Sequence, residues 1–289
     1  MSGRDTLDPL RPWQFFSEEE PAGDGGIVTV NTIFLTNRQC PWRCTMCDLW
    51  KNTLTETVPV GAIPAQIEYA LARLPSARAV KLYNSGSFFD PRAIPVDDYP
   101  AIARVLQPFE RVIVECHPAL IGKDCFRFRD SIAGTFEVAM GLETAHPEVL
   151  RKLNKGMTLD QFAAASSQLH AHSIDMRAFI LVKPPFMEAC EAVHWAERSL
   201  DFAFDCHATA ASLIPTRGTN APPHIEMLEA SQEYGLRLAQ GRVFADVWDL
   251  QEFSACSHCY AVRRERLGAM NRTQSVLPRV ECRACGGRS

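Results

Sequence analysis

Three cysteines, Cys40, Cys44 and Cys47, lie within eight residues of one another in the segment NRQCPWRCTMCDLW (37–50). Their C-x3-C-x2-C spacing offers three thiolates, whereas a closed tetrahedral zinc site takes four ligands. No histidine lies near them in the sequence, and no distant residue stands out as a fourth ligand. A [4Fe–4S] cluster held by three cysteines would keep one iron free of protein ligands. We therefore expect a cluster with an open iron here, with a structural zinc knuckle as the alternative.

An open iron of this kind could bind a small chelating cosubstrate. The amino and carboxylate groups of S-adenosylmethionine (SAM) supply such a pair of ligands, and its sulfonium would then lie beside the cluster. Reductive cleavage of SAM gives methionine and a 5′-deoxyadenosyl radical that abstracts a hydrogen atom from a substrate. The protein would contribute binding, orientation and the exclusion of side reactions.

Four more cysteines form a second group near the C-terminal end, as Cys256-x2-Cys259 and Cys282-x2-Cys285. Two CxxC pairs supply four thiolates and are typical of a closed metal site. Zinc is the first choice of metal, a second iron–sulfur cluster is the alternative, and unliganded thiols are the remaining reading. The other cysteines, which are scattered, are expected to be small buried apolar residues: Cys116, Cys125, Cys190 and Cys206.

The composition bounds the class of protein. The chain has 289 residues with 46% hydrophobic and 22% charged residues, which suits a globular protein with a sizeable core. It contains no run of about 18 apolar residues, and its first residues lack a signal-peptide pattern, so we expect no membrane span. Eleven cysteines, seven of them clustered, indicate metal binding in a reducing compartment, and we expect the cytoplasm.

A regular alternation of segments predicts how the cysteines are positioned. Apolar, β-rich runs occur at 28–36, 79–84, 111–116, 136–142, 175–183 and 206–214. Stretches with helical spacing lie between and after them, at 63–74, 98–107, 120–130, 159–172, 188–203 and 224–240. Six strands that alternate with helices predict an α/β fold with a parallel sheet. Right-handed crossovers would wind it into a partial (β/α)6 TIM-like barrel.

In such barrels the chemistry collects at the C-terminal ends of the strands. The three-cysteine loop directly follows the first predicted strand. The same rule selects other residues at strand ends, namely Asn84, Ser85, Gly86, Glu115, His117, Glu143, Lys183 and Thr216. Five of them have an ordinary alternative. Glu143 could cap a helix ahead of Pro147, Gly86 could serve a turn, Glu115 and His117 could be loop-edge residues, and Lys183 could be a surface lysine.

With these motifs in place, the sequence resembles the radical SAM superfamily. Met46 stands where the superfamily often has an aromatic residue that packs on the adenine. YNSGSFFD (83–90) resembles the Gly-containing motif that holds the methionine amino group, and MGLET (140–144) resembles the G-L-E segment of the fourth strand. The resemblance implies that SAM contacts come from Met46, Ser85, Gly86, Glu115, Glu143, Lys183 and Thr216.

Other segments point to one branch of that superfamily. LNKGMTLDQF (153–162) resembles the N-[KR]-G-x-T segment of the branch that contains the Elongator catalytic subunit. ILVKPPF (180–186) and LIPTRGT (213–219) complete the core, and the combination is closest to archaeosine-synthase-type radical SAM proteins. In that family the substrate is a modified 7-deazaguanine in transfer RNA. The resemblance covers residues 28–220.

We expect three parts in the chain: an N-terminal arm (1–27), a core barrel (28–241) and a small cysteine-rich unit (242–289). Residues 256–289 carry seven arginines against two glutamates, whereas the whole chain has a net charge of −4. A basic unit on an acidic body could contact the phosphates of tRNA, and a solvated arginine-rich face is the alternative. The oligomeric state cannot be inferred from the sequence.

Three functions compete. The first is a radical SAM enzyme that modifies a base in tRNA, supplied with electrons by a flavodoxin- or ferredoxin-like partner. The second is a radical SAM enzyme that acts on a small molecule or a peptide. The third is a non-catalytic iron–sulfur protein for electron transfer or binding, for which the motifs around Ser85 and Glu143 would be superfluous.

Overall fold

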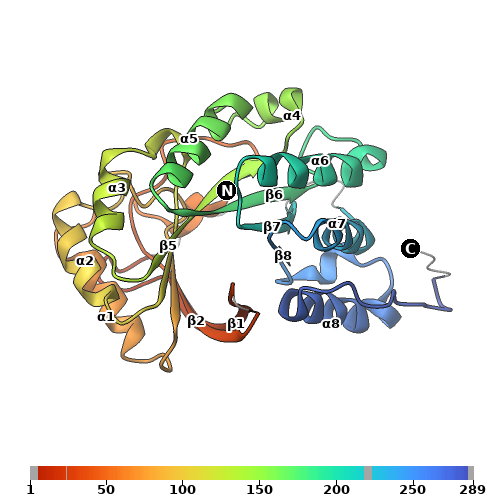
Figure 1. Ribbon diagram of the computed structural model, residues 1–289, viewed down its shortest axis with the longest axis horizontal. Coiled ribbons are helices and arrows are strands. Elements are labelled where there is room, and N and C mark those ends of the chain that lie inside the picture. Colours follow the sequence, from red (N-terminus) through yellow and green to blue (C-terminus); the bar gives the residue numbers. More distant parts are fainter. Residues whose placement is uncertain (1–5, 24, 218–222, 286–289) are drawn as a thin grey trace.

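The computed structural model describes residues 6–23, 25–217 and 223–285. Eight strands form one curled sheet in chain order, in which β1 lies antiparallel to β2 and all later neighbours are parallel (Figure 1). The strands are β1 (Gln14–Pro21), β2 (Ile27–Phe34), β3 (Ala79–Tyr83), β4 (Arg111–Glu115), β5 (Thr135–Glu143), β6 (Asp175–Val182), β7 (Ala210–Pro215) and β8 (Arg242–Ala245). The expected α/β partial barrel is therefore confirmed.

Helices cover the convex side of the sheet (Figure 1). They are α1 (Ala62–Leu71), α2 (Tyr99–Leu106), α3 (Lys123–Asp130), α4 (Pro147–Lys152), α5 (Leu159–Ala171), α6 (Ala192–Asp205) and α7 (Ile225–Leu238). The last helix, α8 (Ser257–Thr273), instead contacts the two edge strands, β1 and β8. Short 3-10 helices are η1 (Leu49–Asn52), η2 (Val96–Asp98), η3 (Pro118–Leu120), η4 (Ala189–Glu191) and η5 (Leu250–Phe253). In the part of the chain that the structure describes, no helix combines the length and the apolar character needed to span a membrane.

All six strands predicted from the sequence are present, and two more flank them. Residues 14–21, which we expected within an N-terminal arm, form β1, and the short β8 follows residue 241. The strands of the sheet thus extend beyond both boundaries expected for the barrel. Parts of the expected segments lie outside the described residues: 1–5 and 24 of the arm, 218–222 of the core barrel, which include the end of LIPTRGT (213–219), and 286–289 of the C-terminal unit.

The main core lies between the convex face of the sheet and the helices. On β3 the side chains of Val80 and Leu82 are fully buried there, together with Ile63 and Ile67 of α1. Full burial of each such side chain stabilises the fold by about 2 kcal/mol. Because successive strand residues point to opposite faces, Lys81 and Tyr83 point to the concave side.

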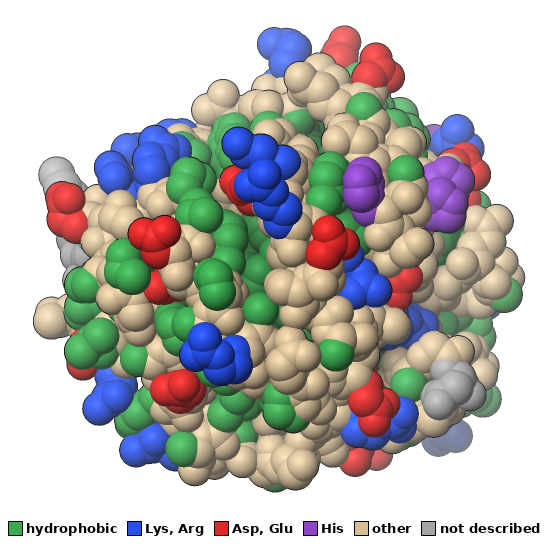
Figure 2. Space-filling model, turned by 60° about the vertical axis from the view of Figure 1, so that its left-hand side comes forward, with side chains coloured by type: hydrophobic (Ala, Val, Ile, Leu, Met, Phe, Trp, Pro, Cys, Tyr) green, Lys and Arg blue, Asp and Glu red, His purple; other side chains and the backbone are tan. Residues whose placement is uncertain are grey.

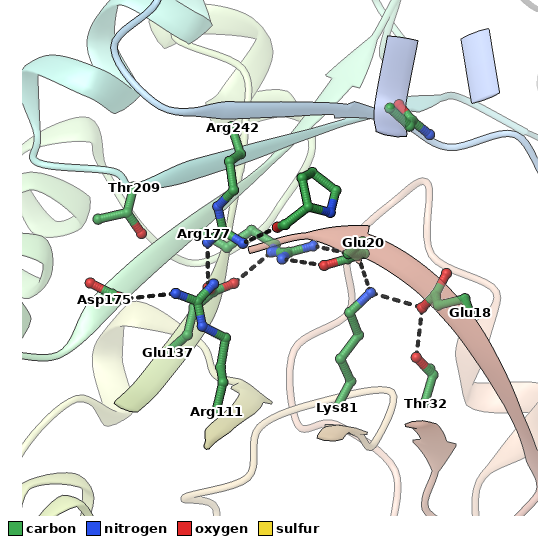
Figure 3. Close-up of polar contacts among 12 residues, drawn as sticks. Glu18, Glu20, Thr32, Lys81, Arg111, Glu137, Asp175, Arg177, Thr209 and Arg242 are labelled. Atoms are coloured by element: carbon green, nitrogen blue, oxygen red, sulfur yellow. Dashed lines mark hydrogen bonds and ion pairs between the residues drawn. The ribbon is translucent and has the colours of Figure 1, made fainter. Parts of the chain in front are cut away.

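The concave side has a floor of charged residues near the N-terminal ends of the parallel strands (Figure 3). Arg177 of β6 bridges Glu20 of β1 (3.0 Å) and Glu137 of β5 (2.6 Å). Lys81 pairs with Glu18 (2.8 Å) and with Glu20. Other pairs extend the floor, and its members are Glu18, Glu20, Glu137, Asp175, Lys81, Arg111, Arg177 and Arg242.

The floor balances four acidic against four basic side chains. Burial alone would raise the pKa of Glu137, but Arg177, Arg242 and Arg111 lower it to about 2. Each buried charge thus has a partner that offsets part of its desolvation. The floor fills the barrel near the N-terminal ends of its parallel strands.

Candidate functional site

The cysteine loop follows β2 at the C-terminal edge of the sheet and forms a cavity of about 110 Å³. Cys40, Cys44 and Cys47 line this cavity together. The other lining residues are Gln39, Trp42, Arg43, Trp50 and Ser85. None of these five carries a thiol, imidazole or carboxylate, so the described lining offers three ligands of the kind that iron–sulfur clusters take. The residues fit a [4Fe–4S] cluster with one open iron.

The three thiols are half-buried. Burial raises the pKa of the Cys44 thiol to about 11, and the pKa values of Cys40 and Cys47 are also raised, chiefly by burial. Because metals bind thiolates, a bound cluster would have to offset the cost of charging these thiols. The loop alone therefore favours neutral cysteines, and metal binding would stabilise the charged form.

The segment 153–156, which follows α4, holds the cysteine loop in place. The Thr45 amide donates to the Leu153 carbonyl (2.9 Å), and the Asn154 side-chain amide donates to the Arg43 carbonyl (3.0 Å). Directly after this segment, Thr158 and Gln161 form a capping box that begins α5. Residues 153–156, which contain the NKG motif, thus form a clamp on the loop. No role was assigned to this motif from the sequence.

Gly156 is the part of the clamp that requires glycine. Its φ is +73°, a left-handed conformation that side chains with a Cβ disfavour. A Cβ added there would lie 2.7 Å from Cδ1 of Trp42. The backbone of the clamp therefore packs directly against the indole ring of the cysteine loop.

His117, which follows β4, also contacts the ring of Trp42. The two rings stack with centroids 3.7 Å apart at 13°. His117 Nε2 donates to the Lys155 carbonyl (3.0 Å), while Nδ1 accepts from the Ala119 amide (3.1 Å). Burial and the charge of Lys155 lower the pKa of His117 to about 4, so the ring is neutral at pH 7. His117 is thus a support for the cysteine loop, not the ordinary loop-edge residue of the alternative.

Ser85 and Gly86 turn around the carboxylate of Glu115. Glu115 accepts hydrogen bonds from the backbone amides of Asn84 and Gly86, the latter at 3.4 Å. Ser85 has a φ of +52°, and a Cβ on Gly86 would lie 3.4 Å from the Cβ of Cys40. Burial raises the pKa of Glu115 against the opposing effect of these amides. Glu115 therefore shapes the turn that places Ser85 in the cavity wall.

Glu143 forms an ion pair with Lys155 of the clamp, with 2.6 Å between Oε1 and Nζ. It ends β5 with a φ of +65°, after a register shift between Gly141 and Glu143. His146, and not Glu143, is the cap residue of α4, so the helix-capping alternative does not hold. The ammonium of Lys155 also acts on Cys44 and Cys40 through its charge. Lys155, like Trp42, Asn154 and Gly156, is a residue of the site to which no role was assigned from the sequence.

The remaining predicted SAM contacts, Met46, Lys183 and Thr216, lie elsewhere around the barrel mouth. Met46 packs against a small apolar cluster that includes Leu181. Lys183 is buried with a φ of +54°, and Thr216 donates its hydroxyl to the Val182 carbonyl (3.1 Å) at the end of β6. The roles of all seven predicted contacts in binding SAM stay predictions.

A row of aromatic rings lines the concave face above the charged floor. Tyr83 and Phe179 lie two residues beyond floor residues on β3 and β6, and their ring centroids are 5.9 Å apart. Phe34 continues the row, 5.9 Å from Tyr83, and Phe16 lies 6.0 Å from Phe34 and 4.9 Å from Trp248. Flat apolar surfaces thus separate the floor from the cysteine loop.

The C-terminal cysteines form a second, compact group. The sulfurs of Cys256, Cys259, Cys282 and Cys285 all lie within 4.8 Å of one another. The group could hold a metal ion, as the sequence predicted. Within the described residues, no other set of three or more cysteine, histidine or acidic side chains forms such a group.

Several arginines of the C-terminal unit form ion pairs with α7. Arg263 and Arg266 are buried, and both pair with Glu229 of α7. Glu233, also on α7, binds Arg266 (2.7 Å) and Arg279 (3.0 Å). Arg263 and Arg266 therefore fasten α8 to α7, and Arg279 fastens the segment after α8 to the same helix, so the basic stretch is not the uniformly exposed face that its composition indicated.

Comparison with known proteins found relatives of low identity, and no family model matches the sequence. An uncharacterised protein of Methanocaldococcus jannaschii, MJ0550, is 25% identical over 74% of this chain and 63% of its own. Archaeosine synthase subunit beta of Methanosarcina acetivorans is 28% identical over 60% of this chain and 53% of its own. The chain thus spans less than two thirds of the length of the curated relatives it matches.

Among solved structures, SuiB of Streptococcus suis, bound to S-adenosylmethionine, matches 78% of this chain and 47% of its own, with a TM-score of 0.55 and 13% identity. Elp3 of Methanocaldococcus infernus matches 78% of this chain and 61% of its own, with a TM-score of 0.52 and 13% identity. At such identities the likeness concerns the fold. The chain has the fold of the radical SAM enzymes with a three-cysteine loop after its first parallel strand, and the resemblance to that superfamily is confirmed.

Proposed function

We propose that the protein is a radical SAM enzyme. The observation that carries this proposal is the convergence of Cys40, Cys44 and Cys47 on one cavity that has no fourth ligand in its described lining. A bound [4Fe–4S] cluster would supply the electron and the open iron for cleavage of SAM. The chain's own residues hold the loop: the clamp and His117 fix Trp42, and Glu115 sets the turn at Ser85.

The substrate that we propose is a 7-deazaguanine-type base in tRNA. Relatives named archaeosine synthase subunit beta support it, as does the row of aromatic rings on the concave face, which suits the stacking of a flat base. A small molecule or a peptide is the competing substrate class. Nucleoside mass spectrometry of a deletion strain separates them, because loss of one modified nucleoside supports tRNA and an unchanged profile speaks against it.

The proposed tRNA contact lies on the C-terminal unit, at arginines that stay exposed: Arg264, Arg272 and Arg283. The face of the molecule shown in Figure 2 carries positive and negative side chains interspersed. That face therefore gives no support for tRNA binding at its surface. Replacing the three arginines by alanine should weaken tRNA binding and lower its salt dependence, since each phosphate contact adds about 1 to the slope. Unchanged binding would place the contact elsewhere.

The test of the enzyme itself uses the anaerobically reconstituted protein with dithionite and SAM. We expect 5′-deoxyadenosine and methionine as products, whereas a wild-type protein loaded with iron and sulfide that forms neither would refute the proposal. In the cell we propose a flavodoxin- or ferredoxin-like reductant. A reducing compartment such as the cytoplasm would keep the clustered cysteines reduced.

A further inference from the structure

The four C-terminal thiols have the spacing of ligands that share one ion. The sulfurs of Cys256 and Cys282 are 3.9 Å apart, as are those of Cys259 and Cys285. A tetrahedral ion with zinc–sulfur bonds of about 2.3 Å separates its thiolates by about 3.8 Å. In a [4Fe–4S] cluster each thiolate binds its own iron at a different corner, so the sulfurs lie considerably farther apart. The group is too compact for such a cluster.

Two parts of the chain bring these thiols together. Cys256 is the cap residue of α8 and Cys259 lies in its first turn, while Cys282 and Cys285 lie in the segment that follows the helix. Four protein ligands complete a tetrahedron and leave no position for a substrate. An ion at such a site would therefore have a structural role.

The surroundings suit the charge of such a site. Zn²⁺ with four thiolates carries a net charge of −2, which favours cationic neighbours. The Arg263 guanidinium donates from Nε to the Cys259 sulfur (3.4 Å) while its other nitrogens face Glu229 and Glu226. Arg263 thus connects the thiol group to α7 through a buried ion pair.

The helix that begins at this group seals the edge of the sheet. Asn271 of α8 accepts from the Ala245 amide and donates to the Ala245 carbonyl, both at 2.8 Å. Gln274 does the same for Val243, at 2.7 and 3.1 Å. These side-chain amides replace the neighbouring strand that β8 lacks. The same helix also contacts β1, so it lies across the opening between the two edge strands (Figure 1).

We propose that Cys256, Cys259, Cys282 and Cys285 bind a single structural Zn²⁺ that fastens α8 across the opening between β8 and β1. The ion joins the start of α8 to the segment after it, and so fixes the helix whose amides complete β8. Zinc has no redox chemistry, so an ion at this site would take no electron meant for the cluster. The proposal is independent of the proposed radical function.

The first test counts metals in the wild-type protein and in a variant that lacks the other cluster, Cys40→Ala/Cys44→Ala/Cys47→Ala. We expect one zinc per chain in both, no iron in the variant, and X-ray absorption of its zinc with four sulfur neighbours at about 2.3 Å. Iron with sulfide in the variant would overturn the proposal in favour of a second cluster. A wild-type protein with no metal beyond the first cluster would overturn it as well.

The second test addresses the fastening of α8. Cys282→Ser should lose the zinc, lower the midpoint of thermal unfolding and speed hydrogen exchange at the Val243 and Ala245 amides. Cys190→Ser is the matched control, because Cys190 is an exposed cysteine outside both groups, and it should change none of the three. Chelation of zinc from the wild-type protein should reproduce the exchange of Cys282→Ser. Unchanged exchange at both amides after complete loss of zinc would overturn the structural role.

Discussion

The two cysteine groups of this chain offer the same ligand in two different arrangements. In the loop 37–50, three thiols line an open cavity at the C-terminal end of the barrel strands, and a clamp from a distant segment holds the loop that carries them. In the C-terminal unit, four thiols lie within 4.8 Å of one another and close on themselves. The number of ligands and their spacing, more than the ligand type, separate the centre that we propose to be reactive from the one that we propose to be structural.

The largest effect expected from this comparison is that of Cys44→Ala. Loss of one of three cluster ligands should abolish formation of 5′-deoxyadenosine and most of the bound iron, because no fourth ligand in the cavity can take its place. Zinc at the C-terminal group should be unchanged. Metal analysis and product assay check both results, and Cys190→Ser serves as the control. A Cys44→Ala protein that still forms product would break the distinction between the groups.

The second effect concerns the Glu143–Lys155 pair, in which both side chains are about 10% exposed. Lys155→Met leaves a buried carboxylate without its partner and should cost about 3 kcal/mol of unfolding free energy. Denaturant titration measures the loss. The double variant Glu143→Gln/Lys155→Met should recover part of it, and an unaltered stability of the single variant would show that the clamp does not depend on this pair.

A third prediction follows from the depressed pKa of His117, about 4 against an ordinary 6.5. The unfolded chain takes up this proton before the folded protein does, so stability should fall as the pH drops from about 6.5 to 4, by up to about 3 kcal/mol. His117→Gln should flatten this dependence in a pH series of unfolding curves. An equal slope in the variant would mean that other groups cause it.

The smallest expected effect is that of Gly156→Ala, which combines an unfavourable positive φ with a contact on Trp42. We expect a loss of about 1–3 kcal/mol and a lower yield of bound iron after reconstitution, with zinc unchanged. Gly268→Ala on α8 is the matched control, because a Cβ there has room and alanine favours helix. Equal iron yields in the two variants would separate the clamp from cluster assembly.

The six parallel strands could be predicted from the sequence because each is a short run rich in apolar and β-branched residues, and the place of Cys40, Cys44 and Cys47 followed from the end of the first of them. The strand β1 was missed because its acidic residues indicate solvent. Glu20 is buried only because Lys81 and Arg177 come from two other strands to meet it. Such partners belong to the tertiary fold and leave no local signal.

The same reason explains the errors at the site and in the C-terminal unit. Lys155 reaches Glu143 because β5 ends with a register shift and a positive φ, which the letters MGLET do not show. From the sequence, Arg263 and Arg266 are expected to belong to a basic surface. In the fold, both pair with Glu229 of α7. A spacing motif could therefore be read from the sequence, whereas the partner of each charge could not.

The central claim is that the three-cysteine loop holds a cluster with an open iron that SAM occupies. Electron paramagnetic resonance of the reduced, reconstituted protein tests it most directly, recorded with and without SAM. We predict one reduced [4Fe–4S] signal that shifts when SAM is added and that is absent from Cys44→Ala. A signal that does not change with SAM, or that persists in Cys44→Ala, would contradict the account.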